Sequence, residues 1–148
     1  MDNSERKIRH AFMVFGLFAV LFMFAGNVTA CLCENISAKE LVKIMKAGGA
    51  DAIFVGKVKT VSGEGVLNVK SLTVTFIVEK SWKVGNPDEY IIYSGGGCEA
   101  YFEVGKEYLV FAKKDEEGKL TTNVCMGTGI ITLSKKHLKY LGKPIRAR

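Results

Sequence analysis

The clearest structural signal in this 148-residue chain is the segment Ala52-Ile53-Phe54-Val55-Gly56-Lys57-Val58. Its length and its β-branched and aromatic content are typical of a β-strand. A glycine inside such a segment, here Gly56, indicates a bulge or a sharp coil of the strand. We therefore expect a strongly coiled sheet.

Further strands and turns follow along the chain. The expected strands are Val66–Trp82, Tyr90–Tyr93, Lys106–Lys113 and Leu120–Val124, and the expected turns are Ser62–Gly65, Gly85–Asp88 and Asp115–Gly118. In the segment Lys106–Lys113, Tyr108, Val110 and Ala112 alternate with Leu109 and Phe111. About five turned strands in fewer than 120 residues predict a mainly β fold, a five-stranded OB-like closed barrel.

Short helices are expected on both sides of these strands. The sequence Ser37-Ala38-Lys39-Glu40 fits a capping box at the start of a helix, and Gly48-Gly49 is expected to end it. A second helix is predicted over Ser134–Leu141, with Leu138 and Leu141 on its apolar side.

The first thirty residues are typical of a secretory signal. Three basic residues lie among the first nine, residues 11–26 carry no charge, and small Ala30 stands at the cleavage position. We therefore expect a signal peptide over residues 1–30 and one domain over residues 31–148, secreted to the extracellular space. An uncleaved segment acting as a membrane anchor remains an alternative.

The segment Val28-Thr29-Ala30-Cys31 also resembles a bacterial lipoprotein processing site, where the cysteine is lipidated. All four cysteines lie after residue 30, and an even number in an exported domain suggests two bridges. Lipidation of Cys31 would strand one thiol, which argues against a membrane-anchored lipoprotein.

The four cysteines are Cys31, Cys33, Cys98 and Cys125. A bridge between Cys31 and Cys33 would be strained, which leaves two pairings between segments. In an extended chain both sulfurs face the same side, so the residue between them would be rigid and point outward. Binding of a soft metal through the two thiolates is the alternative to disulfides.

Residues 31–148 offer little for catalysis. Their one histidine, His137, lies in the lysine-rich terminal helix and is expected at the surface, and Glu79, Glu99 and Glu103 are scattered. There is no serine–histidine or cysteine–histidine arrangement and no phosphate-binding glycine loop. We expect neither an enzyme nor a bound cofactor.

The charge is mildly basic. Residues 1–30 carry one of the six net positive charges, which leaves +5 on the domain. The terminal basic residues are Lys135, Lys136, Lys139, Lys143, Arg146 and Arg148. A solvated helix face and tail explains them, although anionic glycans or a membrane surface would also be attracted. No nucleic-acid partner is expected.

Several segments together resemble the N-terminal, netrin-like domain of the tissue inhibitors of metalloproteinases. They are Cys31-Leu32-Cys33, Ala50–Val58, Cys98-Glu99-Ala100-Tyr101-Phe102, Val104–Ala112, Gly118-Lys119 and Cys125. The resemblance covers nearly all of residues 31–148, in order and with matching cysteine separations.

The resemblance implies an OB-like barrel with the pairings Cys31–Cys98 and Cys33–Cys125. It also implies that the α-amine and carbonyl oxygen of Cys31 chelate the catalytic zinc of a metalloproteinase, while Leu32 enters the pocket beside that zinc. The implied inhibitory edge comprises Cys31, Leu32, Cys33, Glu34, Gly96, Gly97 and Cys98.

The chain departs from this family in three ways. The family's inhibitory domain usually has six cysteines and is followed by a smaller domain, whereas this chain has four. Glu34-Asn35 stands where a proline is usual, and Ser94–Gly97 predicts a flexible lead into Cys98. The alternative function is a non-inhibitory netrin-like module that binds a polyanion or a protein partner.

Overall fold

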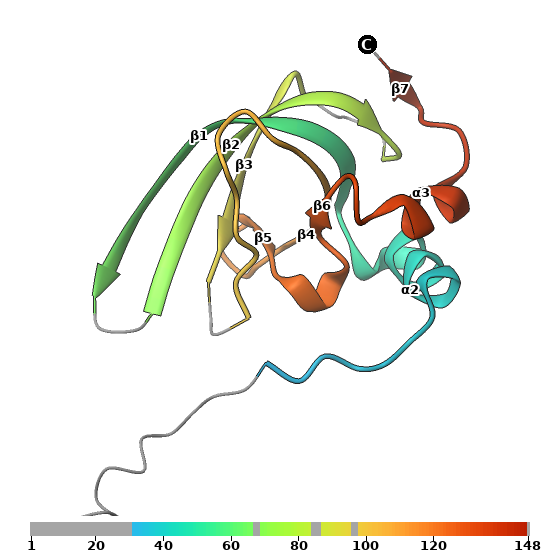
Figure 1. Ribbon diagram of the computed structural model, residues 1–148, viewed down its shortest axis with the longest axis horizontal. Coiled ribbons are helices and arrows are strands. Elements are labelled where there is room, and N and C mark those ends of the chain that lie inside the picture. The colour runs from blue at the N-terminus through green and yellow to red at the C-terminus, as the bar shows by residue number, and fades with distance from the viewer. Residues whose placement is uncertain (1–30, 67–68, 84–86, 96–97, 148) are drawn as a thin grey trace, which may run out of the picture. The chain divides into compact units, whose positions relative to one another are not determined.

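The computed structural model describes residues 31–66, 69–83, 87–95 and 98–147. The main strands are β1 (Ala52–Val66), β2 (Val69–Ser81), β3 (Glu89–Ser94), β4 (Glu107–Lys114) and β5 (Leu120–Thr122). They are paired in the order β1-β2-β3-β5-β4, and β4 pairs with β1 to close the barrel (Figure 1). Only the β3–β5 pair among these is parallel. The expected five-stranded OB-like barrel is confirmed.

Smaller elements flank the barrel. The helical elements are α2 (Ala38–Ile44), η1 (Met45–Gly49), η2 (Val124–Met126) and α3 (Lys135–Leu141); the short strands are β6 (Gly129–Ile130) and β7 (Arg146–Ala147). Strand β6 pairs with β4, and β7 pairs with β2. None of the helices in the described part of the chain has the length and apolar character needed to cross a membrane.

The helical segment formed by α2 and η1 begins and ends where the sequence predicts. The Ser37 hydroxyl accepts a hydrogen bond from the Glu40 amide at 3.2 Å, which satisfies a free donor of the first turn. At the other end Gly48 has a φ of 127°, a conformation that few side chains tolerate, and the helical path stops there.

Some of the predicted boundaries are wrong: the expected strand Val66–Trp82, for example, is observed as β2 over Val69–Ser81. The expected turn Ser62–Gly65 lies inside β1, whose pairing with β2 continues to Val66 opposite Val69. Glycine adopts extended backbone as readily as turn backbone, so the ladder continues past Gly63 and Gly65. The expected strand Leu120–Val124 ends at Thr122, and Val124 begins the turn η2.

The barrel interior is filled by every second residue of its strands. Phe54 of β1, Phe76 of β2, Ile92 of β3 and Val110 of β4 are fully buried there. The rings of Phe54 and Phe76 meet edge to face with centroids 5.4 Å apart. Fully burying each such side chain contributes roughly 1.5–3 kcal/mol, so this interior cluster stabilises the closed barrel.

The intervening residues of β1 and β4 form a second core outside the barrel. Ile53, Leu109 and Phe111 pack against the buried faces of α2 and α3. This explains why β4 has apolar residues at successive positions: one set faces the interior and the other faces the helices. The helices therefore cover one side of the barrel (Figure 1).

Gly56 marks a change of pairing register in the middle of β1. Val55 pairs with Lys80 but Gly56 pairs with Val78, so β2 carries an extra residue at this point. A Cβ atom on Gly56 would lie 2.8 Å from the Ile77 carbonyl oxygen and 3.1 Å from the Phe54 ring. The glycine is therefore required by this close approach of the two strands.

We predict that Gly56→Ala lowers the free energy of unfolding by about 1–3 kcal/mol, because the buried backbone must shift. Urea denaturation monitored by circular dichroism would measure the change. Gly129→Ala is the matched control, since its added Cβ would meet only the Ser134 hydroxyl at 3.4 Å. Equal stability of the two variants would contradict the close approach at Gly56.

The expectation that His137 lies at the surface is wrong. Its side chain is only 9% exposed, packs against Phe111, and leaves Nδ1 buried with no hydrogen-bond partner among the described residues. The helix presents its lysines to solvent and turns His137 toward the outer core. Burial, with a smaller contribution from Lys136, lowers the pKa of His137 below its ordinary value.

This burial makes the domain sensitive to mild acid. The unfolded chain takes up a proton on His137 near pH 6.5, whereas the folded domain takes it up only at lower pH because its pKa is lowered. The free energy of unfolding is therefore at its full value above pH 6.5 and decreases as the pH falls below 6.5. In His137→Met, we predict that the slope of unfolding free energy against pH between 6.5 and 5 is smaller by up to about 1.4 kcal/mol per pH unit. Parallel curves for the two proteins would refute this role.

Candidate functional site

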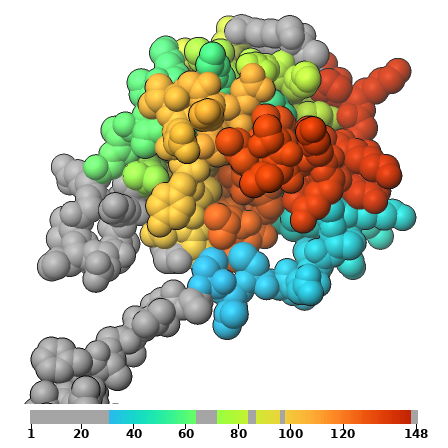
Figure 2. All heavy atoms as spheres, viewed as in Figure 1, coloured from blue at the N-terminus to red at the C-terminus, as the bar shows by residue number. Residues whose placement is uncertain are grey.

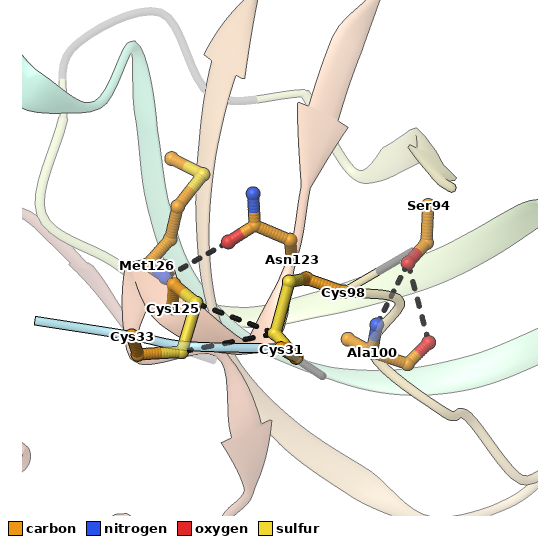
Figure 3. The surroundings of a disulfide bond; sticks show 8 residues. All are labelled: Cys31, Cys33, Ser94, Cys98, Ala100, Asn123, Cys125 and Met126. Carbon is orange, nitrogen blue, oxygen red and sulfur yellow. Dashed lines mark hydrogen bonds between the residues drawn. A yellow bond between two sulfur atoms is a disulfide. The ribbon is translucent and has the colours of Figure 1, made fainter. Parts of the chain in front are cut away.

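Two disulfides hold the segment Cys31–Cys33 against the barrel (Figure 3). Cys31 is bonded to Cys98, with Cα atoms 5.4 Å apart, and Cys33 is bonded to Cys125, with Cα atoms 5.0 Å apart. These are the two pairings that the family resemblance implies. Two disulfides also indicate that the domain folds in an oxidising environment.

The two disulfides lie side by side. The Cys31 sulfur is 3.6 Å from the Cys125 sulfur and 4.0 Å from the Cys33 sulfur. This confirms that alternate cysteines of the extended segment face the same side. The sulfurs are close enough together to suggest a metal site. All four belong to disulfides, however, so none is a free thiolate. The alternative of a soft metal held by thiolates is therefore wrong for this state of the protein.

The Cys98 anchor is fixed from two directions. The Ala100 amide donates to the Ser94 hydroxyl at 2.9 Å, which ties the start of the β3–β4 connection to the end of β3. The Cys98 carbonyl accepts a hydrogen bond from the Val124 amide at 3.1 Å. This second bond joins the two cysteine-bearing segments directly, because Val124 precedes Cys125.

The Cys125 anchor lies in the short turn η2. The Asn123 side-chain oxygen accepts a hydrogen bond from the Met126 amide at 3.1 Å and caps this turn (Figure 3). Before it, the buried Thr122 hydroxyl donates to the Phe111 carbonyl at 2.7 Å. After it, Gly127 has a φ of 85°, and an added Cβ would be only 2.5 Å from Leu41. The turn is therefore packed against both the barrel and α2.

Leu32, between the two anchored cysteines, is 92% exposed. An aliphatic side chain gains no stability from that position in the isolated domain. Cys31, Cys33 and Glu34 are also exposed. The segment is extended and forms no helix or strand.

The remaining predicted edge residues behave differently. Gly96 and Gly97 lie outside the described residues, as do residues 1–30 with the expected signal peptide. Ser94 was expected to belong to a flexible lead, and this is wrong: it ends β3, is buried, and bonds to Ala100. Cys98 is bonded to Cys31.

Sequence reasoning missed a pocket next to this edge. It has a volume of about 270 Å³ and opens between the ends of β3 and β5; its walls are Tyr93, Ser94, Gly95, Thr121, Thr122 and Asn123. Two of its residues contact the anchor segments: Ser94 bonds to Ala100 and Asn123 bonds to Met126 (Figure 3). The pocket depends on the parallel pairing of β3 with β5, which no local pattern in either segment indicates.

Comparison with known proteins does not extend this description. No protein-family model matches the chain, and no curated protein matches it either. The class that fold and site define is a small disulfide-linked β-barrel with an exposed, doubly anchored Cys-Leu-Cys segment.

Each disulfide closes a long loop, so each should stabilise the domain strongly. The bridged residues are 67 and 92 positions apart. Because the other bridge is kept and shortens the loop in the unfolded chain, we predict in the chain-entropy account that C33A/C125A lowers the free energy of unfolding by about 3–4 kcal/mol. Urea denaturation of the oxidised proteins is the measurement.

The variant C31A/C98A is the matched comparison. Because loop entropy varies only slowly with length, its loss should agree with that of C33A/C125A to within about 0.5 kcal/mol. A loss of less than about 1 kcal/mol for either pair would show that the anchors at Cys98 and Cys125 are held by the barrel alone.

Proposed function

We propose that this chain is a secreted inhibitor of zinc metalloproteinases. Cleavage after Ala30 would leave Cys31 as the first residue, with a free α-amine beside an anchored carbonyl. The observation that carries the proposal is the exposed Cys31-Leu32-Cys33 segment, held by two adjacent disulfides with Leu32 directed to solvent.

The chemistry of the proposed contact is chelation in trans. A catalytic zinc is held by three protein ligands and keeps one position for water or substrate. The α-amine nitrogen and the carbonyl oxygen of Cys31 can bind that zinc together and displace the water. An α-amine has a pKa near 8, so its proton is readily lost when a metal competes for the lone pair.

Leu32 would supply the second contact. It follows the chelating residue directly, and its exposed side chain is free to enter an apolar pocket next to the zinc. Burying a leucine contributes roughly 1.5–3 kcal/mol, which also makes the contact selective for proteases with an apolar pocket.

Anchoring is what makes so short a segment an effective ligand. A free peptide with the same three residues would lose conformational entropy on binding. The two disulfides restrict this freedom in advance, which favours binding. The hydrogen bond between Val124 and Cys98 holds the two anchor points in one arrangement.

The first experiment is mass spectrometry of the protein recovered from the medium of an expressing cell. The proposal requires a mature chain that begins on unmodified Cys31. A lipid on Cys31, or a retained 1–30 segment, would remove the ligand and leave the alternative, a barrel that binds a polyanion or a protein partner without inhibition.

The second experiment adds one alanine before Cys31. We predict that this variant loses inhibition at least a hundredfold, because the amine becomes a peptide nitrogen and the new terminus is displaced from the zinc. Inhibition constants against thermolysin and a matrix-type metalloproteinase domain would be compared with those of a control carrying the alanine at the C-terminus. Equal inhibition by both variants, with equal melting temperatures, would refute chelation by Cys31.

A further inference from the structure

The two helices that cover the barrel carry a dense set of lysines. They are Lys39, Lys43 and Lys46 from α2 and η1, and Lys135, Lys136, Lys139 and Lys143 from α3 and the residue pair that follows it. Within the described ranges, none of these seven lysines forms an ion pair; the ion pairs there involve Lys59 and Lys119 instead. One carboxylate, Glu40, lies on the same helices. The two helices and the residue pair after α3 therefore carry an excess of positive charge, although Glu79 and Glu107 of the barrel line a pocket together with Leu138 of α3.

Leu41 and Val42 of α2 and Leu141 of α3 enter one common core, which leaves the lysines of both helices exposed beside each other's helix. Figure 2 shows α2, in cyan, adjoining α3, in red. The Lys46 ammonium donates to the Leu141 carbonyl at 3.1 Å and joins the C-terminal ends of the helices.

Two apolar side chains stand among these lysines. Ile44 at the end of α2 is 47% exposed, and Tyr140 near the end of α3 is 42% exposed. The Lys139 ammonium lies 5.9 Å from the centre of the Tyr140 ring. Both side chains are therefore partly open to solvent on the same helices that carry the lysines.

We infer that this surface, defined by α2 and α3, binds an anionic lipid membrane. Lysine clusters are attracted to acidic headgroups, and adjacent aliphatic and aromatic side chains insert into the boundary between headgroups and acyl chains. A sulfated glycan would use the lysines but offers no apolar phase for Ile44. The surface shares no residue with the Cys31–Cys33 edge, so the inference does not depend on protease inhibition.

The test uses residues 31–148, which contain both hydrophobic clusters and all four cysteines. Binding would be measured by co-sedimentation with vesicles of phosphatidylcholine mixed with phosphatidylglycerol, against vesicles of pure phosphatidylcholine. We expect binding only to the anionic vesicles, weakening as salt is raised.

The main variant, K39Q/K43Q/K136Q/K139Q, spares Lys46 because of its bond to Leu141. We expect it to bind anionic vesicles at least about tenfold more weakly, since each lysine near the surface contributes to the attraction. The matched control, K57Q/K106Q/K113Q/K114Q, removes the same charge from exposed positions elsewhere and should change binding less than about twofold.

A third variant, I44S/Y140S, separates a membrane from a glycan. We expect it to weaken vesicle binding severalfold while leaving retention on immobilised heparin unchanged. The inference is overturned if the parent does not bind anionic vesicles, or if the control loses as much binding as the main variant. It is also overturned if I44S/Y140S binds vesicles as well as the parent does, because the surface would then recognise charge alone.

Discussion

The pair of adjacent disulfides is the constraint on which the site depends. Because Cys31 is bonded to Cys98 and Cys33 to Cys125, the N-terminal segment is held at two points over a span of three residues. One bridge would leave the segment free to pivot, whereas two adjacent bridges fix its direction. The exposure of Leu32 follows from this arrangement: both neighbours turn inward to their anchors, so the side chain between them turns out.

The barrel supplies rigid anchor points because it is packed on two sides. Its interior is filled by aromatic and aliphatic residues, and its outer face is covered by α2 and α3. The C-terminal segment is tied down as well, since the Trp82 ring nitrogen donates to the Gly142 carbonyl at 2.9 Å and β7 pairs with β2. The same helices that complete the outer core direct their lysines to solvent, so stability and surface charge arise from one packing arrangement.

Most of the fold could be predicted from the sequence because local patterns are strong. Three local signals each predicted an element that the structure contains. They are the alternation in β4, the capping serine of α2 and the buried glycine of β1. Errors arose where tertiary contacts outweigh local preference: Gly63 and Gly65 suggested a turn, but pairing with β2 keeps them in a strand. His137 was misplaced because its lysine neighbours suggested solvent, while the helix turns it toward Phe111. The pocket beside Asn123 could not be predicted, since it forms between strands that are distant in sequence.

The central claim is that the Cys31 amine becomes a zinc ligand. The most direct measurement is the visible absorption spectrum of a cobalt-substituted metalloproteinase, because cobalt takes the place of zinc and reports a change of ligand. Adding the mature protein should shift the spectrum as nitrogen and oxygen replace bound water, and selective acetylation of the Cys31 amine should abolish the shift together with inhibition. Inhibition that persists after acetylation, or that occurs with no spectral change, would contradict the account.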